Sequence, residues 1–235
     1  MTISADRQER PILFSGPMVR AILSGAKTQT RRPLKPQPTV MCLGAGTWYP
    51  DSSSPRRKHY ATIDQFLRGL PIDFCPYGQP GDRLWVRETW AHYQTVNHVK
   101  PGDGSGRAFS EIGDGQAAYK ADGFQSIAEL KDHIRLVSDA GFEAIEVRGD
   151  CWRSSIHMPH WASRLTLEIV SVRVERVQEI SSGDIIAEGV DFSQPPHDTD
   201  RLAFARLWNG INAKRGFGWD TNPWVWVVEF KRIGD

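Results

Sequence analysis

The C-terminal third of the chain has the most regular pattern of hydrophobic and polar positions. Residues 163–177, "SRLTLEIVSVRVERV", alternate over a long run and predict one long or bent β-strand. Residues 222–233, "NPWVWVVEFKRI", are more continuously hydrophobic and predict a buried closing strand. Between these two segments, the apolar spacing of residues 198–214 predicts an amphipathic helix. A shorter helix is expected in "SSGDIIAEGV", beginning at its serine caps and ending near Gly189.

The N-terminal part of the chain predicts a strand, a helix and a second strand. Residues 11–15, "PILFS", are a short strand candidate, and Pro17 suits the start of a helix that ends at Gly25. The segment "KTQTRR" that follows alternates in the manner of an extended strand. One face of this strand would then carry Lys27, Gln29 and Arg31, and the other Thr28, Thr30 and Arg32.

The middle of the chain contains one regular landmark between two irregular regions. The segment "GDRLWVRETW", residues 81–90, predicts a strand after a Gly-Asp turn. Residues 36–79 and 94–155 look like insertions, the second with a short strand "AAYKA" and an amphipathic helix starting at Ile127. Long alternating strands joined by short helices predict an α+β fold with a small mixed β-barrel, formed by residues 1–235 as a single domain.

Composition and charge narrow the class of protein. The 235 residues are 40% hydrophobic, with no apolar run near the length of about 18 residues that spans a membrane. The polar N-terminus lacks a signal-peptide pattern, and three widely spaced cysteines favour a reducing, cytoplasmic setting over a disulfide framework or structural zinc. Residues 1–60 contain ten Lys/Arg and three Asp/Glu, a net charge of +7 within a chain of net charge +1. Such asymmetry fits a local anionic ligand better than long-range attraction to duplex nucleic acid.

Several other motifs are interpreted as structural. The glycines of "GDGSGRAF" neither follow a strand nor open a helix, so this segment is expected to be a loop rather than a dinucleotide site. His157 and His160 have a spacing that binds metal on a helix, but Pro159 between them disfavours one, so loop packing is expected. Most of the nine tryptophans lie in strand or helix patterns and are expected in the core. The sequence contains neither a GxSxG serine-nucleophile motif nor a Walker loop.

The segment "SGAKTQTRR", residues 24–32, is the strongest candidate for chemistry. A lysine just after a helix end, followed by two arginines, creates a positive potential that suits an oxyanion or a phosphate. A threonine hydroxyl becomes a nucleophile when a base lies beside it, and a lysine with a lowered pKa can be that base. On these residues alone, an anion-binding edge and a solvated basic strand are equally good interpretations.

Gly25, Lys27 and Arg32 reproduce the G-x-K-x-x-x-x-R signature of the ASCH domain family, whose fold is similar to the PUA fold of RNA-binding and RNA-modifying proteins. The surrounding segments occur in the family's order, among them "GDRLWVRE", "LTLEIVSVRVERV", "DIIAEGV" and "NPWVWVVEFKRI". The resemblance covers residues 11–35, 80–93 and 160–232, and the long form resembles ASCH proteins of phages and prophages. It implies a PUA-like barrel that binds a nucleobase or nucleoside.

One compact branch of that family consists of bacterial amidohydrolases that remove the acetyl group from acetylcytidine. By this resemblance Thr30 would attack the amide carbonyl, Lys27 would activate it, and Glu188 would orient the lysine or pass a proton to the leaving amine. Arg31 and Arg32, together with Gly25, would hold the substrate. The implied chemistry uses neither a metal nor a cofactor, and the implied partner is a modified nucleoside or a short RNA.

Two alternatives remain at this stage. Glu188 near a helix C-terminus opposes the helix dipole and favours a cation beside it, so a purely structural Lys27–Glu188 pair is one of them. The other is a non-catalytic module, either one that binds RNA phosphates through the same basic segment or, less favoured, a phage factor that acts through protein contacts of the insertions.

Overall fold

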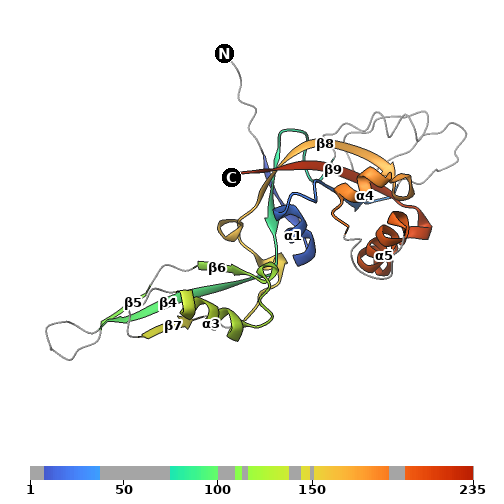
Figure 1. Cartoon of the computed structure of the whole chain (residues 1–235). Coiled ribbons are helices and arrows are strands. Elements are labelled where there is room, and N and C mark those ends of the chain that lie inside the picture. The colour runs from blue at the N-terminus through green and yellow to red at the C-terminus, as the bar shows by residue number, and fades with distance from the viewer. Residues whose placement is uncertain are drawn as a thin grey trace, which may run out of the picture. The chain divides into compact units, whose positions relative to one another are not determined.

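The long strands predicted in the C-terminal third are present and pair with each other. In the computed structural model, β8 (Thr166–Arg176) and β9 (Trp224–Ile233) are antiparallel over their whole length, from Thr166 opposite Ile233 to Arg176 opposite Trp224. A register shift between Ile169 and Ser171 interrupts the ladder, as expected for a bent strand. Figure 1 shows the two strands side by side.

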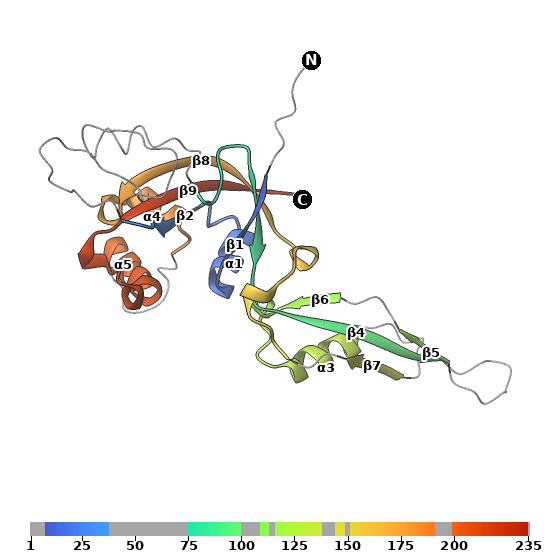
Figure 2. The same ribbon diagram turned by 180° about the vertical axis from the view of Figure 1, so that it is seen from behind.

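This pair is the centre of a five-stranded sheet with the order β1-β3-β8-β9-β2. The outer strands are β1 (Glu9–Leu13), β3 (Arg83–Arg87) and β2 (Gln29–Pro33). β2 pairs antiparallel with β9, with Arg31 opposite Val227, and lies at the end of the strand order. The view from behind in Figure 2 labels β2 next to β9. Strand β2 is therefore the last strand in the order of this sheet.

Three helices connect these strands along the chain. They are α1 (Gly16–Leu23), α4 (Ser182–Ala187) and α5 (Asp200–Asn212). The apolar sides of α4 and α5 pack with one face of β9 in a core cluster whose buried members are Val177, Ile180, Ile185, Phe204, Trp208, Val225 and Val227. Because Val225 and Val227 both belong to this cluster, the face of β9 toward α4 is fixed.

A second, four-stranded sheet forms in the predicted insertion at 94–155. Strand β4 (Trp90–Val99) pairs antiparallel with β5 (Phe109–Ile112), β6 (Gln116–Tyr119) and β7 (Ala144–Arg148). Helix α3 (Ile127–Val137) contributes Leu130 to a small core with Ala91 and Ala118. The helix and the strand "AAYKA" were expected from the sequence, whereas β5 and β7 were not.

The structure describes residues 8–37, 75–99, 109–112, 116–137, 144–148, 151–190 and 199–234. The sequence pattern also predicts a short helix in "IDQFLRGL", which lies outside these ranges, as does most of the segment "GDGSGRAF". The chain divides into two units, which we call the first unit (Met1–Arg10, Ala21–Leu84, Thr166–Asp235) and the second unit (Pro11–Arg20, Trp85–Leu165). The first unit holds β2, β8, β9, α4 and α5, and the second holds the four-stranded sheet and α3.

The α+β class expected from the sequence is confirmed, and the pairings of the described strands form open sheets rather than a closed barrel. The expected core tryptophans are confirmed, because Trp85, Trp208, Trp224 and Trp226 are all buried. The first predicted strand is displaced, since β1 is Glu9–Leu13 instead of residues 11–15. His157 ends the short 3-10 helix η3 (Ser155–His157), and His160 begins the short 3-10 helix η4 (His160–Ala162).

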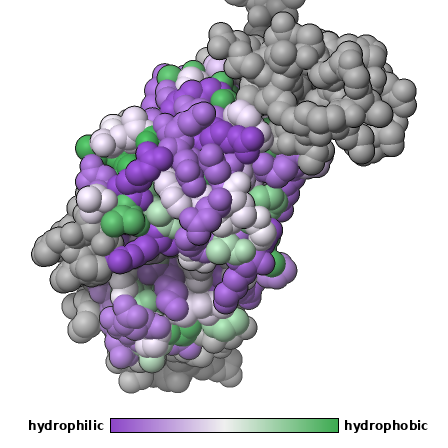
Figure 3. All heavy atoms as spheres, turned by 90° about the vertical axis from the view of Figure 1, so that its right-hand side faces the viewer, coloured by the Kyte–Doolittle hydropathy of each residue, from purple (hydrophilic) through white to green (hydrophobic). Residues whose placement is uncertain are grey.

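Exposed apolar side chains of the described residues come from several elements of the chain. In Figure 3 the described atoms on the face turned to the viewer are mainly hydrophilic, with small hydrophobic areas between them. The large hydrophobic side chains that are exposed come from several elements, including Trp161 on η4, Ile186 on α4 and Leu202 on α5. Among the described residues, no helix has the length and hydrophobicity needed to cross a membrane.

Candidate functional site

The backbone around Lys27 is held on both sides before strand β2 begins. Helix α1 ends at Leu23, and Gly25, two residues later, has a φ of 77°, the left-handed conformation of a glycine that follows a helix. The Lys27 amide donates to the Ala21 carbonyl at 2.9 Å, and the Thr28 amide donates to the Ala187 carbonyl at 2.8 Å. An isolated antiparallel bridge joins Lys27 to Glu188. The segment is therefore fixed between the end of α1 and the end of α4.

The Lys27 side chain lies against the C-terminal end of α4. Its Nζ donates to the Glu188 backbone carbonyl at 2.8 Å and to Glu188 Oε2 at 2.8 Å. The Lys27 side chain is fully buried, and that of Glu188 is 6% exposed. The ammonium group satisfies a helix-terminal carbonyl and compensates a carboxylate that the helix dipole disfavours. The pair expected from the sequence is thus present.

Gly189 makes this close approach possible. Its φ is 72°, and a Cβ at this position would lie 2.8 Å from Lys27 Cβ and 2.9 Å from Ala21 Cβ. Only glycine combines that backbone conformation with so little space. The sequence indicated Gly189 as a helix end, while its contact with the lysine needed the structure.

Arg31 holds the other oxygen of the Glu188 carboxylate. Its guanidinium lies 3.4 Å from Glu188 Oε1, 3.0 Å from Glu175 Oε2 and 3.1 Å from Asp184 Oδ2. The Arg31 side chain is 1% exposed, so its charge is compensated by these carboxylates instead of by water. In this structure Arg31 positions Glu188, a role that the sequence did not suggest.

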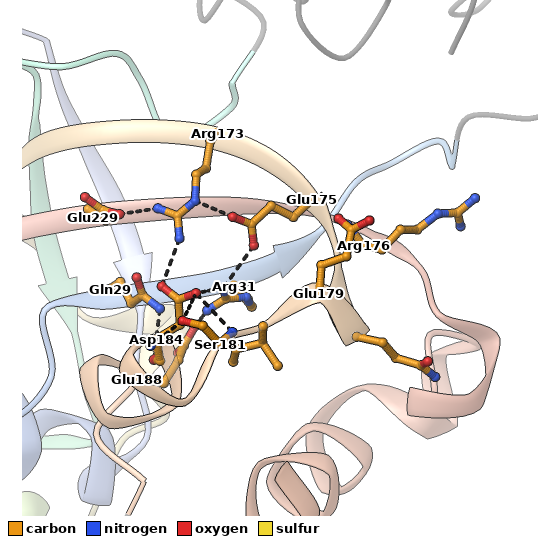
Figure 4. A network of polar contacts seen from close by, with 12 residues as sticks. Gln29, Arg31, Arg173, Glu175, Arg176, Glu179, Ser181, Asp184, Glu188 and Glu229 are labelled. Atoms are coloured by element: carbon orange, nitrogen blue, oxygen red, sulfur yellow. Dashed lines mark hydrogen bonds and ion pairs between the residues drawn. The ribbon is translucent and has the colours of Figure 1, made fainter. Parts of the chain in front are cut away.

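A second arginine extends the network toward the surface. Arg173 on β8 contacts Glu175, Glu229 and Asp184, the last at 3.0 Å from its Nη2. The Gln29 side-chain amide donates to the Asp184 backbone carbonyl at 2.9 Å. Figure 4 shows these groups converging on α4 from β2, β8 and β9. Residues of β2 and β8 therefore hold Asp184 of α4 directly, and Glu229 on β9 takes part through Arg173.

The electrostatic environment lowers the pKa of Lys27. Burial is the largest cause, Glu188 opposes it, and the nearby guanidinium groups of Arg32 and Arg31 add to the lowering. Burial also lowers the pKa of Arg32, with Tyr77 and Glu188 acting in the opposite sense and Arg215 acting in the same sense. A lysine with a lowered pKa can release and accept a proton closer to neutral pH than an exposed one.

Thr30 and Arg32 lie on the other face of β2. Lys27, Gln29 and Arg31 all reach α4, which confirms the predicted alternation for that face. Thr30 is opposite Val228 and Arg32 is opposite Trp226, away from the face that carries Val225 and Val227. Thr30 is buried, and its hydroxyl forms no hydrogen bond with the residues that the structure describes.

The structure thus brings together three of the residues named from the sequence, namely Lys27, Glu188 and Arg31. Gly25 is exposed just beyond α1 and takes no part in this group. Thr30 and Arg32 lie on the face of β2 opposite to the face that meets Glu188. Sequence reasoning missed the carboxylates of Glu175 and Asp184 that support Arg31. The only available signal was the spacing of Asp184 and Glu188, four residues apart on one helix face.

The second unit has an ion pair of its own. Arg164 binds the buried Glu88 carboxylate through two bonds, of 2.9 Å and 3.1 Å, and contacts Asp122 Oδ1 at 2.7 Å. Its guanidinium also lies 4.0 Å from the Tyr119 ring centroid. Burial raises the pKa of Glu88, while Arg164 acts to lower it. The guanidinium faces carboxylates and a ring, as in a structural ion pair.

No cluster of three or more His, Cys, Asp or Glu side chains that could bind a metal ion occurs within the described ranges. No protein-family model, no curated protein and no solved structure matches this chain.

Proposed function

We propose that this chain is an ASCH-type protein with a PUA-like fold that hydrolyses the amide on the exocyclic amine of an acylated cytidine. The five-stranded sheet with α1, α4 and α5 would be the PUA-like core. A cytoplasmic setting and a modified nucleoside or short RNA as partner belong to the same proposal. The alternative is a module that binds RNA without catalysis.

One observation carries the proposal, which is the buried contact between Lys27 and Glu188. These residues are 161 positions apart in the sequence, and they come from the two short segments that carry the resemblance to acetylcytidine amidohydrolases. A buried ion pair contributes little to stability compared with well-packed apolar side chains. The lowered pKa of Lys27 supports a role as a base.

The proposed reaction has two steps. By the resemblance to the amidohydrolases, the Thr30 hydroxyl attacks the amide carbonyl and neutral Lys27 accepts its proton, although the two side chains lie on opposite faces of β2 in this structure. That proton passes to the departing cytidine amine as the C–N bond breaks. Water then hydrolyses the acyl-threonine ester and releases the carboxylic acid. Glu188 holds the Lys27 amine, and Arg31 holds the other oxygen of the Glu188 carboxylate in place.

The network favours catalysis over phosphate binding by the same residues. Lys27 and Arg31 both contact carboxylates, and both side chains are buried. A backbone phosphate would have to displace these carboxylates and reach a fully buried ammonium group. The structural observations therefore support a reaction centre better than a phosphate clamp at Lys27.

The test is the release of cytidine from N4-acetylcytidine by the purified protein, followed by chromatography. Thr30→Val keeps the shape of the side chain but removes the hydroxyl, and it should slow turnover by a factor of about 100 or more, a size typical of lost covalent or acid–base catalysis. Lys27→Met should do the same, and the wild-type rate should rise with pH through a value below the ordinary lysine pKa of about 10.4.

The outcomes separate the alternatives. Loss of turnover in Lys27→Met with full turnover in Thr30→Val would make water the nucleophile and exclude the acyl-threonine step. This comparison is informative because Thr30 lies on the face of β2 opposite to Lys27. Absence of cytidine release by a folded wild-type protein that binds short RNA would replace the enzyme by the binding module.

A further inference from the structure

The indole of Trp161 in the second unit is used neither by a core nor by the proposed chemistry. Its side chain is 60% exposed, whereas the other tryptophans that the structure describes are buried or half-buried. A single exposed hydrophobic side chain needs no explanation by itself. The surroundings of Trp161 decide whether this ring is an ordinary surface residue or part of a binding site.

Two rings of strand β4 hold Trp161 in place. Its ring centroid lies 5.7 Å from that of Trp90 and 5.8 Å from that of His92, with interplanar angles of 88° and 82°. Trp90 and His92 are two residues apart on β4 and therefore share one face of the strand. Edge-to-face contacts with two rings fix the orientation of the indole before any ligand arrives. Ordering this side chain thus adds little to the free-energy cost of binding.

The same short helix η4 is also anchored on strand β3. The ring of His160 lies 5.1 Å from that of Trp85 at an angle of 82°. The guanidinium carbon of Arg87, two residues along β3, lies 4.6 Å from the centroid of the Trp85 ring. Consecutive residues of η4 therefore rest on two strands, with an arginine beside one of the contacts.

A second arginine lies beside the other contact. The backbones of Arg153 and Trp90 are joined by two hydrogen bonds of 2.7 Å and 3.2 Å. The guanidinium carbon of Arg153 lies 5.5 Å from the centroid of the Trp90 ring, and its side chain is exposed. We call Arg87, His92, Arg153, His160 and Trp161 the aromatic platform.

The charge of this region is positive. Residues 151–165, "CWRSSIHMPHWASRL", contain two arginines and two histidines and neither aspartate nor glutamate. The carboxylates of Glu88 and Asp122 in neighbouring segments both contact Arg164. Arg87 is ordered by an aromatic ring, so its charge is not compensated there by a carboxylate. Such a guanidinium can still bind an anion.

An ordered aromatic ring next to positive charges is the combination that binds single-stranded nucleic acid. An unpaired base stacks on the ring, and the adjacent phosphates contact the cations. An uncharged carbohydrate would use the ring but gain nothing from the arginines. The bases of a duplex are already stacked on each other, so a duplex would use the arginines but not the ring.

We infer that the aromatic platform binds single-stranded nucleic acid, with one unpaired base stacked on Trp161 and a neighbouring phosphate on Arg87 and Arg153. The inference goes beyond the proposed function, because the platform belongs to the second unit, whereas Lys27 and Glu188 belong to the first.

Fluorescence anisotropy with a labelled ten-nucleotide single-stranded RNA tests the stacking contact. Trp161→Leu keeps an apolar side chain but removes the ring, and it should weaken binding about tenfold or more, the size of one lost base-stacking contact. Trp161→Phe keeps a ring and should retain most of the affinity. Because the indole is exposed, both variants should remain folded, which thermal unfolding checks. A DNA strand of the same sequence should bind equally well, since neither contact uses the 2′-hydroxyl.

Arg87→Gln tests the phosphate contact. It should weaken binding and reduce the slope of log affinity against log salt concentration by about 0.7, the value for one phosphate of a single strand. Lys214→Gln removes one exposed positive charge from the first unit and should change neither quantity, which controls for net charge.

Equal affinities of Trp161→Leu and Trp161→Phe, equal losses in Arg87→Gln and Lys214→Gln, or tighter binding of a duplex of the same length would overturn the platform. Turnover of N4-acetylcytidine keeps this result apart from that of the proposed function. If acetylcytidine is hydrolysed and Trp161→Leu binds RNA as the wild type does, the reaction stands and the platform fails. If it is not hydrolysed and the Trp161-dependent binding persists, the platform stands and the reaction fails.

Discussion

At the scale of single residues, the burial of the charged Lys27 side chain is the feature that most needs a physical explanation. It is the largest of the fully buried side chains among the described residues, and burial of an ammonium group costs several kcal/mol unless its partners are well placed. Glu188 offers it a carboxylate and a backbone carbonyl, while Arg31 fixes the carboxylate from the other side. Apolar side chains of similar volume would hold α4 on the sheet equally well, so retention of this pair points to chemistry.

Gly189 and Gly25 provide a matched test of the close approach beside Lys27. Both have positive φ, 72° and 77°, so alanine is strained by roughly 1–2 kcal/mol at either position. Only at Gly189 does the added Cβ meet other atoms within 3 Å, which adds roughly 1–3 kcal/mol of overpacking. Chemical denaturation should therefore show a larger loss for Gly189→Ala than for Gly25→Ala. Equal losses would contradict the packing of Lys27 described above.

At the scale of elements, the short helix α4 holds the network together. Ser181 caps it by accepting a hydrogen bond from the Asp184 amide at 3.1 Å, and the Asp184 carboxylate accepts bonds from Ser181 in return. Ile185 packs into the core, and Glu188 ends the helix against Lys27. This one short helix and its two capping residues thus supply a core anchor and two carboxylates that contact Arg31 on β2.

The cap of α4 makes the free energy of unfolding depend on pH in the acid range. Burial would raise the pKa of Asp184, but hydrogen bonds from Ser181 and the charge of Arg31 lower it to about 2. Because the unfolded chain has the ordinary Asp pKa of about 3.9, this stabilisation is complete above that value and is lost as pH falls toward 2. Asp184→Asn should flatten the decline in unfolding free energy between about pH 4 and pH 2, measured by chemical denaturation across that range.

The control for this prediction is Asp220→Asn, at an exposed aspartate of the 3-10 helix η7 (Trp219–Thr221). Its acid profile should match that of the wild type. A steep acid transition that persists unchanged in Asp184→Asn would place the responsible carboxylate elsewhere in the fold.

Elements with strong periodicity were predictable from the sequence, and contacts between elements were not. Strands β8 and β9 and helices α4 and α5 have patterns that local physics largely decides. β5 and β7 are short, and their pairing with β4 depends on distant partners. The pairing of Lys27 with Glu188 could be expected from the helix dipole, whereas Arg31 as the support of Glu188 could not, because its carboxylate partners come from β8 and α4.

At the scale of the whole molecule, each unit has its own buried ion pair. The Lys27–Glu188 pair lies in the first unit and the Glu88–Arg164 pair lies in the second. The single domain expected from the sequence stays a prediction that folding experiments can address. Two units with separate cores and separate charged centres can respond separately to substitution.

Arg164→Met tests that separation, because it leaves the buried Glu88 without the two hydrogen bonds from the guanidinium. The expected cost is about 3–5 kcal/mol in the second unit, as for other buried pairs that lose one partner. Hydrogen exchange should become faster in β6 and α3, with β8 and β9 protected as in the wild type. Equal loss of protection in both sheets would show that the chain unfolds as one cooperative unit.

The central claim is that the Lys27–Glu188 pair is catalytic, and one substitution tests it most directly. Glu188→Gln keeps the size of the side chain and an oxygen that can accept from Lys27, but removes the negative charge. Turnover of N4-acetylcytidine and thermal stability should be measured on the same sample. We expect turnover to fall by a factor of about 100 or more in a protein that remains folded. Unchanged turnover in a folded Glu188→Gln protein would contradict the catalytic role and make the pair a structural one.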